Sequence, residues 1–118
     1  GLAGPYDFLP LRDPVLKKIF GPPDGLARTQ PINFVSPGAP PTFLAAGTAD
    51  HTVSPGNTKR LAQRLAQAGD DVQVKLYPGI THRLLIGAFS PLLRWLAPVL
   101  ADSLAFIHHT PPKQGNVP

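Results

Sequence analysis

The 118-residue sequence lacks cysteine, methionine and glutamate. Without cysteine, the chain can form neither a disulfide nor a thiolate metal site. All seven acidic residues are aspartates. The chain also lacks a long uninterrupted apolar run, because two prolines, an arginine and an aspartate interrupt its most apolar stretch, residues 84–107. These interruptions argue against a membrane span.

No leader segment is visible at the start of the sequence. The chain opens on Gly1 with neither an initiator methionine nor a basic segment, so no signal peptide is predicted. The missing methionine predicts a processed start or a fragment of a larger protein. The missing leader slightly favours the cytoplasm but does not fix the compartment.

Positive charge is in excess but is not clustered. Eleven Lys and Arg against seven Asp give a formal charge of +4, and the only adjacent basic pairs are Lys17–Lys18 and Lys59–Arg60. A nucleic-acid surface usually concentrates its basic residues in a patch or stripe. We therefore expect no nucleic-acid partner, although charge alone keeps a binder of acidic surfaces open as an alternative.

The hydrophobic residues, 42% of the chain, are sufficient for a modest core. The 16 prolines and 11 glycines stand mainly between apolar segments, which favours many short loops over a low-complexity tract. We expect one domain, or a piece of one, over residues 1–109, and a flexible tail over residues 110–118.

The first third of the chain predicts one helix. Residues 1–8 are compatible with the end of a strand. Asp13 can cap a helix that starts at Pro14, and Gly21 stops it. Residues 21–41, rich in proline and glycine, are expected to form a long loop.

The middle of the chain gives the clearest pattern. The apolar run 41–46 predicts a strand buried on both faces, as in a parallel sheet. Helical spacing of apolar residues predicts a helix over 54–69, with Ser54 as its cap and Gly69 as its stop. Alternation over 71–77 predicts a more exposed edge strand.

The last third predicts a loop followed by a divided helix. His82 is expected in the loop after the second strand. Ser90 is expected to cap a helix that Pro98 divides and that ends near His108. Strands alternating with helices indicate an α/β fold of about three parallel strands with flanking helices.

Asp50 and His82 are the candidate catalytic residues. Each follows the carboxyl end of a predicted strand, which is where open α/β sheets carry their chemistry. Neighbouring parallel strands lie about 4.8 Å apart, so these two loops should lie side by side. An aspartate beside a histidine can orient the imidazole, which then removes a proton from a serine hydroxyl.

Three segments resemble one enzyme family. Residues 47–55 resemble the G-x-x-D-x-x-V-x-P segment of α/β-hydrolase carboxylesterases, and residues 77–82 resemble the loop that ends in the triad histidine. Residues 1–8 resemble the strand and turn after the nucleophile unit in the feruloyl-esterase-like branch, which is related to prolyl oligopeptidases.

The resemblance implies the C-terminal half of an α/β-hydrolase that acts on a small-molecule carboxylic ester. It makes Asp50 the triad acid and His82 the general base, with no metal and no organic cofactor.

The nucleophile of that family is missing from this sequence. It lies in a G-x-S-x-G elbow before the acid and the base, and no serine here has glycines in that pattern. The glycine-rich oxyanion loop is missing as well. We therefore expect the isolated chain to be inactive and to belong to a larger hydrolase. Its exposed sheet edge is then expected to self-associate or to bind the N-terminal half of the same enzyme.

Two other functions stay open. A pseudoenzyme-like binding module would keep the fold without the nucleophile. A prolyl-oligopeptidase-like peptidase would share the Asp and His loops and cleave peptides instead of esters.

Secondary site candidates are weaker. His51 could join Asp50 and His82 in a metal site, but the spacing matches no standard motif. Trp95 could line an acyl pocket, although packing of the last helix on the sheet is the favoured interpretation.

The remaining candidates are expected at a helix end and near the first turn. His108 and His109 should have a structural role at a helix C-terminus. By analogy with the family, Tyr6 and Asp7 could border a substrate pocket, although a role in the first turn is the favoured interpretation.

Overall fold

Two parallel strands form the centre of the fold. In the computed structural model, which describes residues 1–109, β1 (Thr42–Gly47) pairs with β2 (Val72–Tyr77) along its whole length. The first residues of the chain lie on the other side of β1, where Leu2 and Ala45 form a parallel bridge. The expected sheet of about three strands is therefore a two-stranded sheet extended by one bridge.

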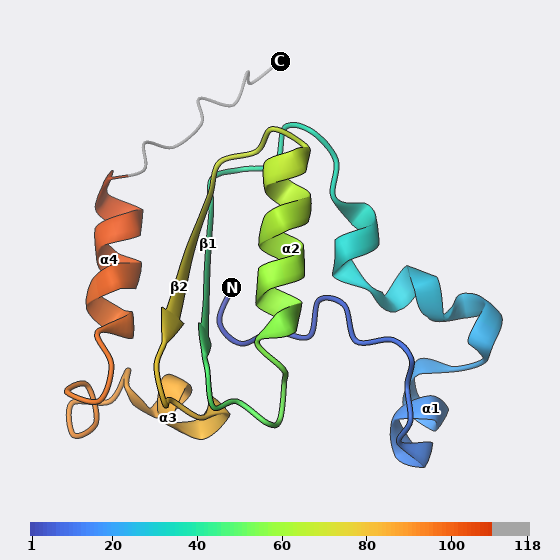
Figure 1. Cartoon of the computed structure of the whole chain (residues 1–118), viewed down its shortest axis with the longest axis horizontal. Coiled ribbons are helices and arrows are strands. Elements are labelled where there is room, and N and C mark those ends of the chain that lie inside the picture. Colours follow the sequence, from blue (N-terminus) through green and yellow to red (C-terminus); the bar gives the residue numbers. More distant parts are fainter. Residues whose placement is uncertain (110–118) are drawn as a thin grey trace.

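Helices cover both faces of β1. The helices α2 (Gly56–Gln67) and α4 (Val99–His109) lie on opposite sides of the strands (Figure 1). Successive side chains of a strand point to opposite faces. Phe43 accordingly stacks on Phe106 of α4, at 5.6 Å between ring centroids, whereas Leu44 belongs to the cluster that α2 covers.

The core consists of two clusters divided by the sheet. On the α4 side it joins residues of both strands to α3 (His82–Gly87) and α4, including Phe43, Tyr77, Leu85 and Val99. On the α2 side it joins Leu44 to three apolar residues of that helix, Leu61, Ala62 and Leu65. β1 is thus buried on both faces, as its continuous apolar run predicts.

Local capping explains the helices predicted in the first half. Asp13 accepts hydrogen bonds from the backbone N–H groups of Val15 and Leu16, at 2.7 and 3.0 Å, and starts α1 (Pro14–Phe20). α2 ends before Gly69, whose φ of +83° is the left-handed conformation expected of a glycine stop.

The expected long loop over residues 21–41 is incorrect. This segment contains two 3₁₀ helices, η1 (Pro23–Thr29) and η2 (Pro31–Phe34). Each begins with a proline, whose fixed φ suits the first helical position. Gln30, 1% exposed, lies between them and anchors them by accepting the backbone N–H of Phe8 at 2.7 Å.

The prediction after β2 is also incorrect in two places. His82 is the first residue of the short helix α3, which Thr81 caps, and does not lie in the loop. No helix starts at Ser90; residues 90–96 form turns, and α4 starts at Val99, directly after Pro98. Pro98 therefore precedes a helix instead of dividing one.

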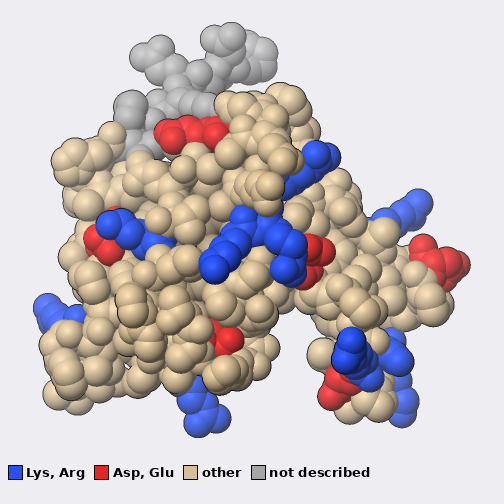
Figure 2. Space-filling view, in the orientation of Figure 1, with Lys and Arg blue, Asp and Glu red and all other residues tan. Residues whose placement is uncertain are grey.

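The face of the molecule that carries α2 has no continuous basic stripe (Figure 2). Lys and Arg side chains there form separate patches, one of them over α2, interspersed with uncharged and acidic side chains (Figure 2). Within residues 1–109, none of the helices combines the length and the apolar character needed to span a bilayer. The tail expected at residues 110–118 lies outside the described residues.

Candidate active site

The first element of the site is the turn that leaves β1. The backbone N–H of Asp50 donates to the carbonyl of Gly47 at 3.3 Å, which closes the turn and brings the carboxylate back toward the strand end. Asp50 is 3% exposed, although it follows a strand in a connecting segment. Such burial of an aspartate requires partners for its carboxylate.

The turn after β1 is bonded to the turn after β2. Ala49 donates its N–H to the carbonyl of Ile80 at 3.1 Å, and the Oγ1 of Thr48 accepts the N–H of Gly79 at 2.9 Å. A Cβ on Gly47 would lie 1.9 Å from the carbonyl oxygen of Ile80. Only glycine therefore permits this separation of the two turns.

This contact brings the predicted acid and base together. Nδ1 of His82 lies 2.8 Å from Oδ2 of Asp50, across 32 positions of the sequence. The Asp50 side chain has no exposed surface, whereas that of His82 is 31% exposed. One member of the pair is shielded from water and the other is accessible.

Asp50 is held by further hydrogen bonds. Its Oδ1 accepts the backbone N–H groups of Thr52 and Val53, at 2.9 and 2.8 Å. Both carboxylate oxygens are therefore bonded, Oδ1 to the chain of its own loop and Oδ2 to the imidazole. This arrangement fixes the carboxylate in one orientation and satisfies its buried oxygens.

The hydrogen bond defines the chemistry available to His82. An ionised carboxylate can only accept, so Nδ1 of the neutral imidazole carries the proton and Nε2 carries the lone pair. In the part of the chain that the structure describes, no group hydrogen-bonds to Nε2. A small pocket of about 180 Å³ lies beside His82, and His51, Thr52 and Arg83 also line it. The pair can therefore act as an oriented general base facing a pocket.

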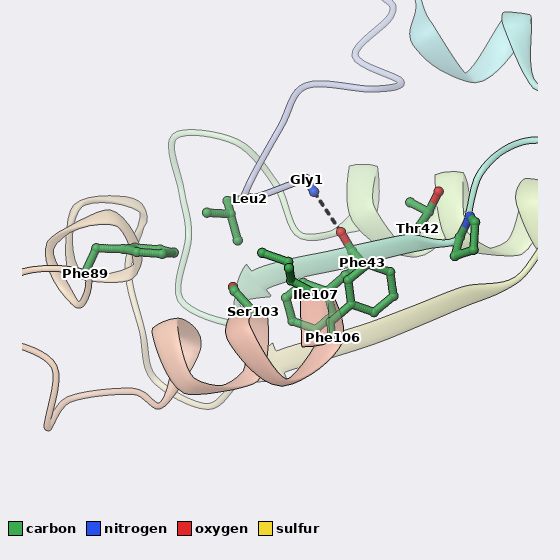
Figure 3. Close-up of a pocket in the computed structure, with 9 residues that line it drawn as sticks. Gly1, Leu2, Thr42, Phe43, Phe89, Ser103, Phe106 and Ile107 are labelled. Atoms are coloured by element: carbon green, nitrogen blue, oxygen red, sulfur yellow. Dashed lines mark hydrogen bonds between the residues drawn. The ribbon is translucent and has the colours of Figure 1, made fainter. Parts of the chain in front are cut away.

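The serines do not complete a triad among residues 1–109. Ser54 accepts the N–H of Gly56 at 3.3 Å, but it is not the helix cap that the sequence predicted, because Pro55 occupies the N-cap position of α2. Ser103 donates to the carbonyl of Val99 at 2.6 Å. It lines a different, mainly apolar pocket of about 410 Å³ between α4, Leu2 and Phe43 (Figure 3).

A second polar contact joins β2 to α4. The hydroxyl of Tyr77, the last residue of β2, donates to Oδ2 of Asp102 at 2.7 Å. Burial first, and then the hydrogen bond and the charge of Asp102, raise the pKa of Tyr77. Tyr77 is 6% exposed, so this contact fixes α4 against the strand that leads to the His82 turn.

Two of the secondary candidates lie close to the site. His51 lines the pocket beside His82, but residues 1–109 hold no group of three or more Asp or His side chains that could bind a metal ion. Asp7 lines a larger pocket next to this one and pairs with Arg60. Tyr6 instead packs against the core cluster under α2.

The other secondary candidates lie outside the site. Trp95 is 76% exposed, which corrects the expectation that it packs on the sheet; its Nε1 donates to the carbonyl of Leu92 within the turn. His108 and His109 lie in the last turn of α4, at the helix end where the sequence predicted them.

Sequence reasoning missed two residues that hold the site. Thr48 joins the two turns through its hydroxyl, and no sequence pattern indicates a threonine for this purpose. Gly47 is the first residue of the G-x-x-D-x-x-V-x-P segment, so the sequence pattern already pointed to a glycine at this position. Its physical reason, the close approach of the Ile80 carbonyl, appears only in three dimensions.

Known proteins resemble this chain in sequence and in fold. A sequence profile of the prolyl oligopeptidase family matches residues 20–107. No curated protein sequence matches the chain. Among solved structures, a truncated form of a carbohydrate esterase from gut microbiota superposes with a TM-score of 0.62 at 25% identity, over 75% of this chain and 28% of that chain.

Two structures of one thermophilic enzyme are also similar. Esterase 2 of Thermogutta terrifontis phosphonylated by sarin gives a TM-score of 0.60 at 24% identity, over 88% of this chain and 38% of that chain. The same enzyme phosphoramylated by tabun gives a TM-score of 0.57 at 20% identity, over 83% of this chain and 36% of that chain. The chain therefore has a partial α/β-hydrolase fold and spans little more than a third of these esterases at most.

Proposed function

Because the chain belongs to the prolyl oligopeptidase family, we propose that it supplies the acid and the base of a serine hydrolase that acts on carboxylic esters. The observation that carries this proposal is the 2.8 Å contact between the buried carboxylate of Asp50 and Nδ1 of His82. The similarity to structures of esterases supports the ester as substrate class.

The proposed reaction uses a serine from outside these 118 residues. Nε2 of His82 removes the proton of the serine hydroxyl as its oxygen attacks the ester carbonyl, and later donates that proton to the leaving alcohol. Asp50 orients the imidazole and stabilises the imidazolium formed in between. Water then attacks the acyl-enzyme, with His82 again acting as the base, and releases the acid.

A peptidase is the second candidate. The family that matches the chain is named for an oligopeptidase, and the same Asp–His pair serves acyl transfer from an amide as well as from an ester. The pair alone does not select between the two bonds. The substrate class therefore needs a direct comparison of ester and peptide turnover.

The test uses the natural full-length protein and the 118-residue chain side by side. We expect the full-length protein to hydrolyse p-nitrophenyl acetate and the 118-residue chain to show no turnover. Asp50→Asn should lower kcat about 10³- to 10⁴-fold with little change in KM, because the imidazole loses its orienting acceptor. The exposed Asp24 offers a matched control, and Asp24→Asn should leave both constants unchanged.

Each contrary result has a defined meaning. Faster turnover of a proline-containing peptide than of the ester would replace the esterase by the peptidase. An inactive full-length protein would favour the binding module. Full activity in Asp50→Asn would show that the pair is not the acid and the base of the reaction.

A further inference from the structure

A larger pocket lies next to the one beside His82. It is an open pocket of about 840 Å³, lined by the segment 5–12, by α1, by the loop that follows Asp50 and by the first turns of α2. Its apolar wall includes Phe8, Leu11, Leu16 and Phe20. Ligand pockets are typically of about this size, with apolar walls and few polar groups.

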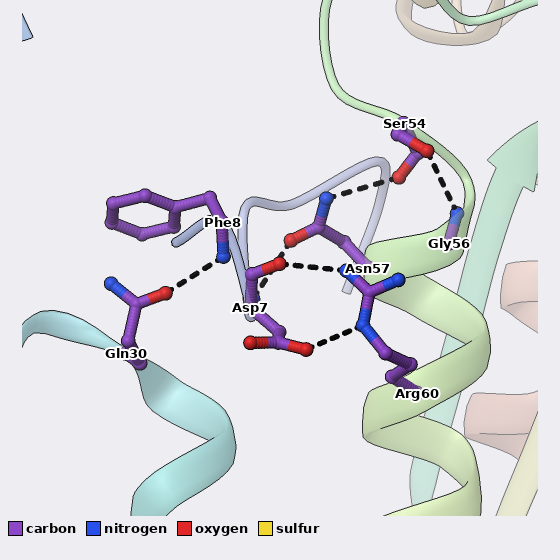
Figure 4. A network of polar contacts seen from close by, with 7 residues as sticks. All are labelled: Asp7, Phe8, Gln30, Ser54, Gly56, Asn57 and Arg60. Atoms are coloured by element: carbon purple, nitrogen blue, oxygen red, sulfur yellow. Dashed lines mark hydrogen bonds and ion pairs between the residues drawn. The ribbon is translucent and has the colours of Figure 1, made fainter. Parts of the chain in front are cut away.

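Polar contacts hold the backbone of one wall of this pocket. The backbone N–H groups of Asp7 and Phe8 each donate at 2.7 Å to a buried side chain, Asn57 and Gln30 respectively (Figure 4). Arg60 pairs with the carboxylate of Asp7 and also donates from Nη2 to its carbonyl at 2.8 Å. These hydrogen bonds hold the backbone of residues 7 and 8 in place, and the pocket beside them stays open.

The apolar side chains of α1 lack a full set of neighbours. This helix has no buried residue, and Leu16 is 41% exposed where it lines the pocket. Phe20 reaches Phe8 across the segment, with ring centroids 5.0 Å apart. An apolar group placed here would remove the surface of Leu16 and both rings from water, which is favourable.

The pocket adjoins the proposed catalytic pair. His51 and Thr52 line both this pocket and the small pocket beside His82. A molecule whose reacting bond lies at His82 can therefore extend across these two residues and place a substituent against Leu16. Three charged residues line the pocket: Asp7 and Arg60 pair with each other, and Arg12 is exposed to water, so none of them is a buried, unpaired charge against the apolar wall.

We propose that this pocket binds a saturated alkyl group of the ester whose carbonyl is attacked beside His82. The inference rests on the proposed ester hydrolysis and adds the substituent that the enzyme recognises. The alkyl group takes the space between Leu16 and Phe8, and the ester group lies over His51 and Thr52.

The test measures binding of an alkyl acetate series to the ¹⁵N-labelled 118-residue chain by amide NMR. From ethyl to hexyl acetate, we expect affinity to rise about threefold to fourfold per added methylene, the factor that corresponds to burial of one methylene. The amide signals of Leu16 and Thr52 should shift together.

Two variants of α1 provide the matched comparison. Leu16→Asp places a charge on the pocket wall and should abolish the dependence on chain length. Ile19→Asp makes the same change on the same helix, at a residue that is 68% exposed and does not line this pocket, and should preserve it. Circular dichroism of both variants should show the helix content of the unchanged chain, and this measurement excludes unfolding as the cause of a lost response.

The outcomes separate this proposal from the proposed function. Affinity that is independent of chain length, or an unchanged series in Leu16→Asp, overturns the pocket even if the full-length protein hydrolyses esters. The series is then repeated with the full-length protein. If affinity depends on chain length in the 118-residue chain but not in the full-length protein, another part of the protein covers Leu16, and the proposal is overturned. Absence of ester turnover with chain-length dependence intact overturns the esterase and leaves an apolar binding site.

Discussion

Replacing Gly47 by alanine should separate the two turns that carry Asp50 and His82. The added Cβ would lie 1.9 Å from the carbonyl oxygen of Ile80 and 2.6 Å from its carbonyl carbon. Ordinary contacts begin at 3.4 Å, so the turns must move apart by about 3.4 minus 1.9, or 1.5 Å. Both atoms are backbone atoms, so no side-chain rotation relieves the clash.

The cost has two parts. Overpacking of this kind typically costs about 1–3 kcal/mol. Moving the turns also lengthens the 3.1 Å bond from Ala49 to Ile80, a loss of about 1 kcal/mol. We expect Gly47→Ala to lower the free energy of unfolding by about 3 kcal/mol, and the Tm by on the order of 10 °C.

The assay combines urea unfolding, followed by circular dichroism, with proton NMR of the imidazole. The hydrogen-bonded Nδ1 proton of His82 should give a low-field signal that Gly47→Ala removes. Gly25→Ala is the control, because nothing lies within 4 Å of a Cβ at that glycine. A Gly47→Ala chain that keeps the signal and loses less than about 0.5 kcal/mol would refute this account of the site.

Two further predictions concern the strands. The raised pKa of Tyr77 means that, above pH 10, the unfolded chain ionises this tyrosine while the folded chain keeps it protonated. The contribution of this raised pKa to the free energy of unfolding is intact below pH 10 and is lost above pH 10, by about 1.4 kcal/mol per pH unit. Urea unfolding from pH 9 to 11 should show this loss of stability, and Tyr77→Phe should reduce its dependence on pH. Residues 1–3 form a sheet edge that pairs with no further strand among residues 1–109. Because such an edge can pair with a second copy of the chain, light scattering should detect self-association at high concentration. A chain that is monomeric at every concentration contradicts this.

The sequence was sufficient to predict an element where its local pattern and its burial in the fold agree. β1 is a continuous apolar run with helices on both faces, α2 has a clear apolar stripe, and Asp13 and Gly69 define helix ends by their own chemistry. The proximity of Asp50 and His82 was predictable, because parallel strands bring their carboxyl ends to one edge of the sheet. Their catalytic roles stay predictions.

The errors fall where tertiary contacts decide the local structure. The turns at residues 90–96 leave Leu92 and Trp95 83% and 76% exposed, so neither apolar side chain finds a core surface on which a helix there could pack. The residue before Pro98 is also disfavoured in a helix, which leaves too few residues for a stable one. The preceding segment forms the helix α3, because its Leu85 is completely buried in the same core cluster as Val99.

The arrangement of the long connection was also beyond sequence reasoning. Residues 23–34 form 3₁₀ helices around the buried amide of Gln30, whose partner, the N–H of Phe8, is 22 positions away. The hydrogen bond of Thr48 to Gly79 spans 31 positions in the same way. Contacts of this range leave no periodic trace in the sequence.

The carboxylate of Asp50 is already held in place before the proposed reaction begins. Its two oxygens accept three hydrogen bonds and its side chain is shielded from water before any serine or ester is present. In the proposed reaction, the loss of rotational freedom and of hydration would therefore be part of folding and not of each turnover. A base that is preorganised in this way needs almost no rearrangement as charge develops on the imidazole, which is how a rigid polar environment lowers the barrier of a proton transfer.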